Sequence, residues 1–230
     1  MNAVSQCYRL LMVFILLSGA ASSALSDEFL TLTRTDRLVP EHCRDFDLAD
    51  FGSYTRYIIY GIEKSKAVGF THEYPISRGG AGALWNVLKD QDSRDRLKVP
   101  KGEDPARLER DLATIERYAP DMGFDFKKEG DVLEVLSLVD LEKEYPSSQY
   151  FLTGGIAYRS QEGGNTLGEL DVVVGQKSDC LIVAVGESKL GIRQLGHAKS
   201  QLRRFEAFRK AKLCSDRPAR APAFPICSAN

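Results

Sequence analysis

Two acids and one lysine near the end of the chain have the types and spacing that metal-assisted chemistry requires. Asp171 lies where an apolar, β-branched run begins, Glu187 lies where a second such run ends, and Lys189 follows two positions later. Mg²⁺ prefers oxygen ligands and usually takes only one or two carboxylates from a protein. Such an ion orients an attacking water and neutralises charge on a phosphate, and a lysine beside it stabilises that charge or helps to activate the water. Asp171 and Glu187 are therefore candidate metal ligands, and Lys189 is a candidate catalytic residue.

The two acids meet only if this segment folds back on itself. The apolar runs Leu170–Val174 and Leu181–Val185 are joined by the polar stretch Gly175–Asp179, which is the pattern of a β-hairpin. Antiparallel pairing brings the start of one arm beside the end of the other, so we expect Asp171 and Glu187 to lie close in space. The two-residue period of a strand places the glutamate and the lysine on one face.

This arrangement resembles the core of the PD-(D/E)xK nuclease superfamily, and the resemblance covers residues 149–212, about a quarter of the chain. It implies a restriction-endonuclease-like α/β core, with a mixed sheet, a central hairpin and flanking helices. By the same resemblance, Asp171 and Glu187 bind Mg²⁺ or Mn²⁺, Lys189 serves the chemistry, and the substrate is a phosphodiester, in DNA rather than RNA. Leu170 stands where the family name has proline.

The segment after the hairpin predicts an amphipathic helix, because its apolar residues recur at spacings of three and four: Leu195, Ala198, Leu202, Phe205 and Phe208. The stretch from Gln201 to Phe205 resembles the QxxxY signature of the RecB-like branch of the superfamily, with phenylalanine in place of tyrosine. The resemblance implies that Gln201 lies near the metal and the substrate. Lys199, Arg203 and Arg204 would hold the nucleic-acid backbone.

Two elements are expected before the hairpin. Residues 131–144 predict a helix. In the nuclease family such a helix often presents an acid to the metal, so Glu134 and Glu142 are the nearest candidates, although each also fits an ordinary solvated acid. Residues 149–158 predict the first core strand, bent at Gly154 and Gly155.

The preceding segment, residues 25–130, is expected to be an N-terminal α+β extension of unknown role. Its predicted elements are a strand at 55–62, a second strand at 67–74, a loop or flexible lid at 77–83, and helices at 84–97 and 107–118, the last ended by Pro120. The glycine-rich loop lacks the ending of a phosphate-cradling motif. The tripeptide Asp125-Phe126-Lys127 also fits (D/E)xK but has no hairpin arm before it.

The N-terminus and the cysteines indicate export. Residues 1–24 have one cation, a short apolar run and a small-residue ending, which predict a cleaved signal peptide. Cys43, Cys180, Cys214 and Cys227 then remain, an even number that suits disulfides in an oxidising compartment, with three pairings open. We expect a periplasmic or secreted protein with no membrane segment after cleavage, and with a Cys- and Pro-rich tail at 214–230 behind a core at 131–213.

The charge distribution favours a phosphate-rich partner. The whole chain carries a net charge of −1, yet residues 189–220 hold ten Lys or Arg and only two acids. We predict a secreted Mg²⁺-dependent nuclease. The alternatives are a catalytically inactive nuclease-like fold that binds nucleic acid or an acidic envelope component, and an exported structural protein. No Ser/His/Asp set accompanies a nucleophile.

Overall fold

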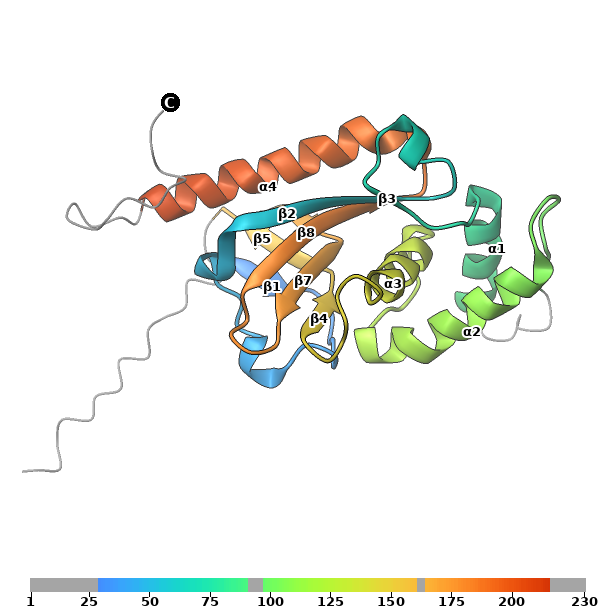
Figure 1. Cartoon of the computed structure of the whole chain (residues 1–230), viewed down its shortest axis with the longest axis horizontal. Helices are drawn as coiled ribbons and strands as arrows, with labels where there is room; N and C mark the ends of the chain where they lie inside the picture. Colours follow the sequence, from blue (N-terminus) through green and yellow to red (C-terminus); the bar gives the residue numbers. More distant parts are fainter. Residues whose placement is uncertain (1–28, 91–96, 161–163, 216–230) are drawn as a thin grey trace, which may run out of the picture.

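The computed structural model describes residues 29–90, 97–160 and 164–215 (Figure 1). Within these residues four α-helices and a curled mixed sheet form a mixed α/β fold, the coarse class that the sequence predicts. The expected signal peptide and residues 216–230 of the expected tail lie outside the described part. No helix in the described part combines the length and the apolar composition needed to cross a membrane.

The larger sheet has the strand order β3-β2-β8-β7-β4. The strands are β2 (Phe51–Gly61), β3 (His72–Glu73), β4 (Tyr150–Thr153), β7 (Val172–Gln176) and β8 (Ile182–Lys189). The expected hairpin is confirmed, because β7 and β8 pair antiparallel with Val172 opposite Gly186. β2 runs parallel to β8, and Gly61 pairs with Lys189 at the ends of both strands. The core sheet therefore draws two strands from the segment expected to be an N-terminal extension.

A smaller sheet has the order β1-β5-β6, formed by β1 (Leu30–Leu32), β5 (Ile156–Arg159) and β6 (Thr166–Leu170). The strand expected at 149–158, bent at Gly154 and Gly155, is therefore two strands, β4 and β5, that are separated at those glycines. The chain leaves the larger sheet after Thr153 and enters the smaller one at Ile156, so one apolar run serves two sheets.

Glycines and one acid occupy the two passages between the sheets. Gly155 has a φ of 67°, and a Cβ on Gly154 would clash with the backbone oxygen of Asp171, so this passage requires glycine. The chain returns from β6 to β7 through a single residue, Asp171. Gly155 donates its N–H to the carbonyl of Leu170 at 2.8 Å, which fastens the two passages together. The candidate ligand thus lies at a fixed corner of the backbone.

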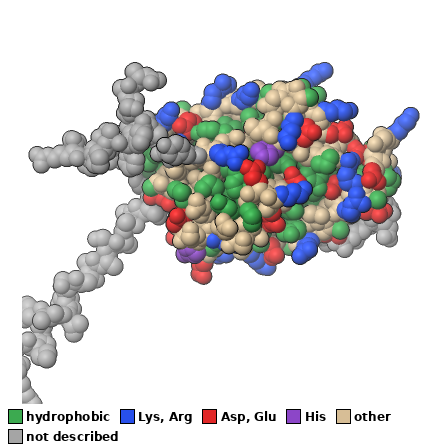
Figure 2. All heavy atoms as spheres, in the orientation of Figure 1, with side chains coloured by type: hydrophobic (Ala, Val, Ile, Leu, Met, Phe, Trp, Pro, Cys, Tyr) green, Lys and Arg blue, Asp and Glu red, His purple; other side chains and the backbone are tan. Residues whose placement is uncertain are grey.

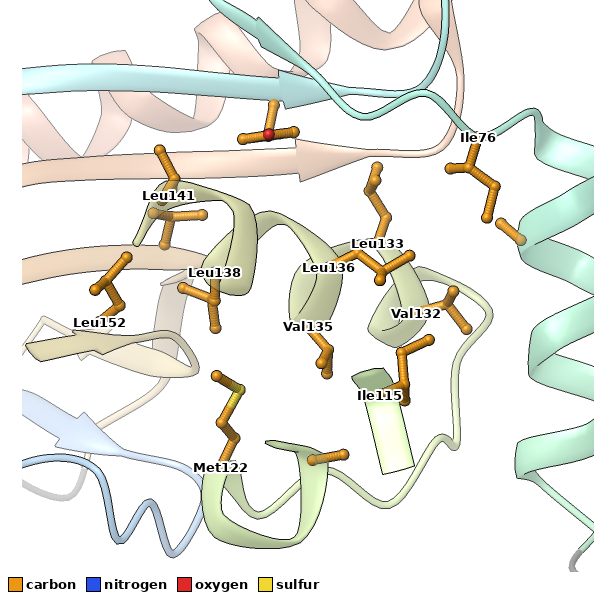
Figure 3. Close-up of a cluster of buried hydrophobic side chains, with 14 of the residues drawn as sticks. Ile76, Ile115, Met122, Val132, Leu133, Val135, Leu136, Leu138, Leu141 and Leu152 are labelled. Atoms are coloured by element: carbon orange, nitrogen blue, oxygen red, sulfur yellow. The ribbon is translucent and has the colours of Figure 1, made fainter. Parts of the chain in front are cut away.

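Different helices cover the two faces of the larger sheet (Figure 1). α1 (Arg78–Leu88), α2 (Pro105–Met122) and α3 (Gly130–Leu141) lie on one side, and α4 (Leu195–Ser215) lies along the other. The helices expected at 131–144 and after Gly191 are thereby confirmed. Strand alternation divides the core, since Ala184 packs on the α3 side and Val185 on the α4 side. Figure 3 shows α3 filling the first of these cores with Leu133, Leu136 and their neighbours.

The glycine-rich stretch expected to be a loop is helical instead. Ser77 caps the N-terminus of α1 by accepting a hydrogen bond from the backbone N–H of Gly80, and Ala81 and Leu84 are fully buried. A Cβ on Gly80 would lie 3.0 Å from the carboxyl carbon of Glu103, so glycine permits close packing here. Burial of the apolar face outweighs the poor helix propensity of glycine. The helix ends at Leu88, short of the expected residue 97.

Two further expectations for this region need correction. α2 does not end at Pro120 but continues to Met122, because Ala119 and Met122 bury their side chains in the core and Gly123 closes the helix with a φ of 70°. It begins at Pro105, two residues before the expected residue 107, with Asp104 as the N-cap. The strand expected at 67–74 is a short 3₁₀ turn, Lys66–Val68, followed by β3.

One disulfide joins the two halves of the chain. Cys43, in the short 3₁₀ turn Glu41–Cys43, is bonded to Cys180, next to the turn of the hairpin. This bridge ties the hairpin to the N-terminal segment, and it agrees with the predicted use of cysteines. The disulfide is compatible with an exported protein.

Candidate metal and catalytic site

The three predicted residues meet at the end of β8. The amine of Lys189 lies 2.9 Å from Oδ2 of Asp171 and 2.6 Å from Oε2 of Glu187. The same oxygen of Asp171 accepts the backbone N–H of Ser188 at 2.9 Å. The hairpin register explains this meeting, because the pairing of Val172 with Gly186 places the residue before β7 beside the last residues of β8. Two acids that lie sixteen positions apart therefore surround one cation.

Glu187 is the most deeply buried member of the site. Its side chain is 1% exposed, and its second oxygen, Oε1, is buried without a hydrogen-bond partner among the described residues. Burial raises the pKa of Glu187, the negative charge of Asp171 raises it further, and Lys189 opposes both effects. A buried acid with one unpaired oxygen is costly unless a further cation or donor satisfies it.

Lys189 is held in its charged form. Burial alone would lower the pKa of its amine, but the adjacent charges of Asp171 and Glu187 outweigh burial and raise it. In this arrangement the amine donates to both carboxylates and is protonated at neutral pH. Lys189 is thus suited to stabilise negative charge rather than to accept a proton.

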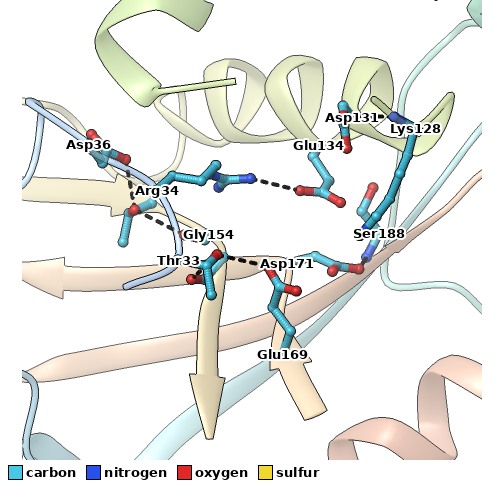
Figure 4. A network of polar contacts seen from close by, with 12 residues as sticks. Thr33, Arg34, Asp36, Lys128, Asp131, Glu134, Gly154, Glu169, Asp171 and Ser188 are labelled. Carbon is cyan, nitrogen blue, oxygen red and sulfur yellow. Dashed lines mark hydrogen bonds and ion pairs between the residues drawn. The ribbon is translucent and has the colours of Figure 1, made fainter. Parts of the chain in front are cut away.

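A third acid reaches the site from α3. Figure 4 shows Glu134 projecting from this helix toward the strand ends where Asp171 and Ser188 lie. Burial raises the pKa of Glu134, and the charge of Asp171 raises it further, while Arg34 lowers it. Glu134 forms an ion pair with Arg34 at 3.1 Å. Glu142 follows α3 as its C-cap residue, and within the described part of the chain no hydrogen bond or ion pair joins it to the site.

Glu134 was named among the candidates because a helix precedes the hairpin, but helical periodicity alone did not separate it from Glu142. Arg34 was missed altogether. It lies just after β1, in the segment expected to be an extension, and no local motif marks it. Its contact with Glu134 spans 100 positions of sequence, so only the tertiary packing reveals it.

The predicted substrate-binding residues do not form one basic stripe. Arg204 donates to the carbonyl of Leu167 in β6 at 3.1 Å, whereas Lys199 and Arg203 line a cavity of about 290 Å³ between α4 and β2. On the face drawn in Figure 2, Lys and Arg side chains are interspersed with acidic ones. Gln201, on α4, is partly buried, and its Oε1 is buried without a partner among the described residues. Besides Oε1 of Glu187, an unpaired amide oxygen is thus present on α4, which packs on β8.

Larger cavities lie elsewhere. One of about 800 Å³ runs along α1 and is lined by Arg78, Lys98 and Glu129, among others, and it includes none of the three converging residues. The chemistry-bearing groups therefore indicate the strand ends and not this cavity.

The donor set at the strand ends fits a hard divalent cation. Asp171 and Glu187 offer carboxylate oxygens, one of them buried and unpaired, and Mg²⁺ completes its shell with water and substrate oxygens. Asp171, Glu187 and Glu134 do not bring three oxygens within 4.8 Å of one another. The one described group that does meet that limit, His42 with Cys43 and Cys180, has its two sulfurs joined as a disulfide.

No family model, no curated protein and no solved structure matches this chain. The resemblance to the PD-(D/E)xK superfamily therefore stays a prediction from the residues.

Proposed function

We propose that this chain is an exported, divalent-metal-dependent nuclease that hydrolyses phosphodiesters, with DNA as the first substrate to test. The observation that carries the proposal is the convergence of Asp171, Glu187 and Lys189 at one end of β8, with a buried carboxylate oxygen left unpaired. A hairpin between α3 and α4 supports a restriction-endonuclease-like core as part of the same proposal.

Each side chain then has a distinct role. Asp171 and Glu187 would hold the ion, with Mn²⁺ able to replace Mg²⁺, and Glu134 would add negative charge beside it from α3. When bound, the ion supplies Lewis-acid activation of the phosphodiester and of the attacking water. Lys189 stabilises the charge that develops on the phosphate, as its protonated state favours. Gln201 orients the water or substrate through its unpaired amide oxygen.

The first prediction concerns catalysis. With Mg²⁺ or Mn²⁺ present, the purified protein should cleave linear or circular DNA, and EDTA should abolish cleavage. Lys189→Ala should lower the cleavage rate by about 10²–10⁴-fold, because the developing charge loses its only adjacent ammonium. Gel assays on DNA and RNA identify the substrate and give the cleavage rates of the wild type and the variant. A binding assay shows whether the variant still binds that substrate.

A matched control lies in the look-alike tripeptide. Lys127 forms an exposed ion pair with Asp125 at 2.5 Å. Lys127→Ala should leave cleavage unchanged. A wild type that cuts neither DNA nor RNA with either metal contradicts the enzymatic proposal.

A binding protein without catalysis is the second candidate, and one observation favours it. Lys189 already contacts both acids, so the three charges form an ion cluster that is largely complete without a metal. In that case the wild type binds nucleic acid or an acidic polymer in the presence of EDTA, and added metal produces neither cleavage nor a rise in thermal stability.

A further inference from the structure

Arg34 is the residue outside the predicted core that contacts an acid of the site. Its Nη1 lies 3.1 Å from Oε2 of Glu134, and the two side chains are only 14% and 16% exposed. The oxygen that accepts this bond is fixed, while the rest of the Glu134 carboxylate faces Asp171, as Figure 4 shows. Arg34 therefore touches the site through another residue.

The backbone on both sides of Arg34 is anchored. Thr33 donates its N–H and its hydroxyl to the carbonyl of Gly155, both at 2.7 Å. Asp36 accepts a hydrogen bond from the hydroxyl of Thr153 at 2.7 Å and one from the N–H of Leu38 at 2.8 Å. These anchors fasten the segment to the passage between β4 and β5, which is itself bonded to the passage that carries Asp171.

The guanidinium is confined as tightly as its backbone. It stacks on the ring of Phe124, with its central carbon 3.7 Å from the ring centroid. A Cβ on Gly154 would lie 2.9 Å from its Nη2, and a Cβ on Gly155 would lie 3.1 Å from its Nε. Nε and Nη2 have no hydrogen-bond partner among the described residues. The ion pair with Glu134 is therefore the polar contact that offsets part of the cost of burying the guanidinium.

We propose that Arg34 is a positioning residue, which holds Glu134 facing Asp171 and thereby raises the affinity of the site for a divalent cation. This inference rests on the proposed function. It gives the N-terminal segment a role in the site. The ring of Phe124 and the two glycines hold the guanidinium of Arg34, and this guanidinium fixes the carboxylate of Glu134. Outer-shell partners of this kind typically contribute 10–100-fold to metal affinity.

Charge repulsion and positioning predict opposite changes in the affinity for Mn²⁺ when Arg34 is replaced. If Arg34 only repelled a metal ion, Arg34→Gln would tighten Mn²⁺ binding. If it positions Glu134, Arg34→Gln and Arg34→Lys should both weaken Mn²⁺ binding by about 10–100-fold, because lysine keeps the charge but loses the planar fork and the stacking. Titration calorimetry with Mn²⁺ at a fixed pH of about 7.5 measures the affinity without reference to activity.

A double-mutant cycle separates positioning from general loosening. In a Glu134→Gln background, Arg34→Gln should have at least tenfold less effect on Mn²⁺ affinity than in the wild type, since its target is gone. Additive effects, or unchanged or tighter binding in both Arg34 variants, would overturn the proposal. Thermal melts without metal establish that each variant is folded.

Two outcomes distinguish a failure of the role given to Arg34 from a failure of the proposed metal site. If the wild type binds no Mn²⁺, the proposed metal site itself fails. If Arg34 variants do not fold, Phe124→Leu decides, because it removes the stacking without changing any charge: weaker Mn²⁺ binding supports positioning, and wild-type affinity overturns it.

Discussion

At the scale of single residues, the site contains more buried negative charge than its own cations neutralise. Asp171 and Glu187 pair with Lys189, and Glu134 pairs with Arg34, so three acids face two cations. Burial disfavours the ionised glutamates and raises the pKa of both. A divalent cation would reverse this effect, because it stabilises the ionised carboxylates that it contacts.

The second prediction is a pH dependence of metal binding. Because the pKa of Glu187 is raised, a proton occupies the carboxylate at mildly acidic pH and must leave before the ion binds. Affinity for Mn²⁺ should therefore increase from pH 6 to pH 8, by up to about tenfold per pH unit, and binding should release protons. Calorimetry in two buffers of different ionisation enthalpy measures the release, and an affinity that is flat with pH would contradict this account.

The third prediction concerns Asp36, which is 2% exposed. Burial raises its pKa, while hydrogen bonds from Thr153 and Leu38 partly oppose the shift. The folded protein therefore holds this proton more tightly than the unfolded chain. The stability gained from the protonated form is complete below the unfolded pKa and is lost as the pH rises through the folded one.

Asp36→Asn should remove this dependence. The free energy of unfolding of the wild type, relative to that of the variant, should fall between pH 4 and pH 7, as measured by urea unfolding at several pH values. Asp45→Asn, at an exposed position nine residues away, is the control and should show a constant difference. A constant difference for Asp36→Asn would show that its burial has no such effect.

At the scale of elements, the site depends on two backbone passages that cross between sheets. The passage through Gly154 and Gly155 lies against the one that contains Asp171. Strand pairing fixes the hairpin, but these crossings decide which way the aspartate faces.

The fourth prediction tests this crossing. Gly154→Ala would drive a methyl group into the backbone oxygen of Asp171 and toward Arg34, so it should destabilise the protein by about 1–3 kcal/mol or more and impair the site. Gly196→Ala is the matched control, because nothing lies within 4 Å of its Cβ position in α4. That change should be neutral or stabilising by up to about 1 kcal/mol. Urea unfolding distinguishes them, and equal effects would contradict the role given to Gly154.

Sequence reasoning found what short-range patterns determine. The hairpin and the meeting of Asp171 with Glu187 follow from two apolar, β-branched runs and from the turn between them. Local helix propensity did not predict that α1 begins in a glycine-rich stretch or that α2 continues through Pro120. In both helices the burial of apolar side chains, namely Ala81, Leu84 and Met122, outweighs propensity. Arg34 and the parallel pairing of β2 with β8 depend on contacts that cross the chain, and no local period signals them.

At the scale of the whole molecule, the N-terminal half completes the central sheet. β2 covers the edge of β8 along most of its length, and the paired residues include Ile59 with Glu187. The segment expected to be the core, residues 131–213, would expose that edge if it were isolated.

The fifth prediction follows. A fragment of residues 131–213 should lack a cooperative urea transition and should aggregate, whereas residues 29–215 should unfold in one transition. Circular dichroism and light scattering measure both properties. A cooperative transition in the short fragment would show that the hairpin and its helices are stable without β2.

The bridge between Cys43 and Cys180 has a consequence for a nicked molecule. A protease that cuts the backbone anywhere between these positions would leave Arg34 on one piece and Glu187 on the other, still covalently joined. The two pieces would migrate as one species on a non-reducing gel and would separate only after a thiol is added. In an oxidising environment full of proteases, such a molecule would tolerate an internal cut without releasing either half.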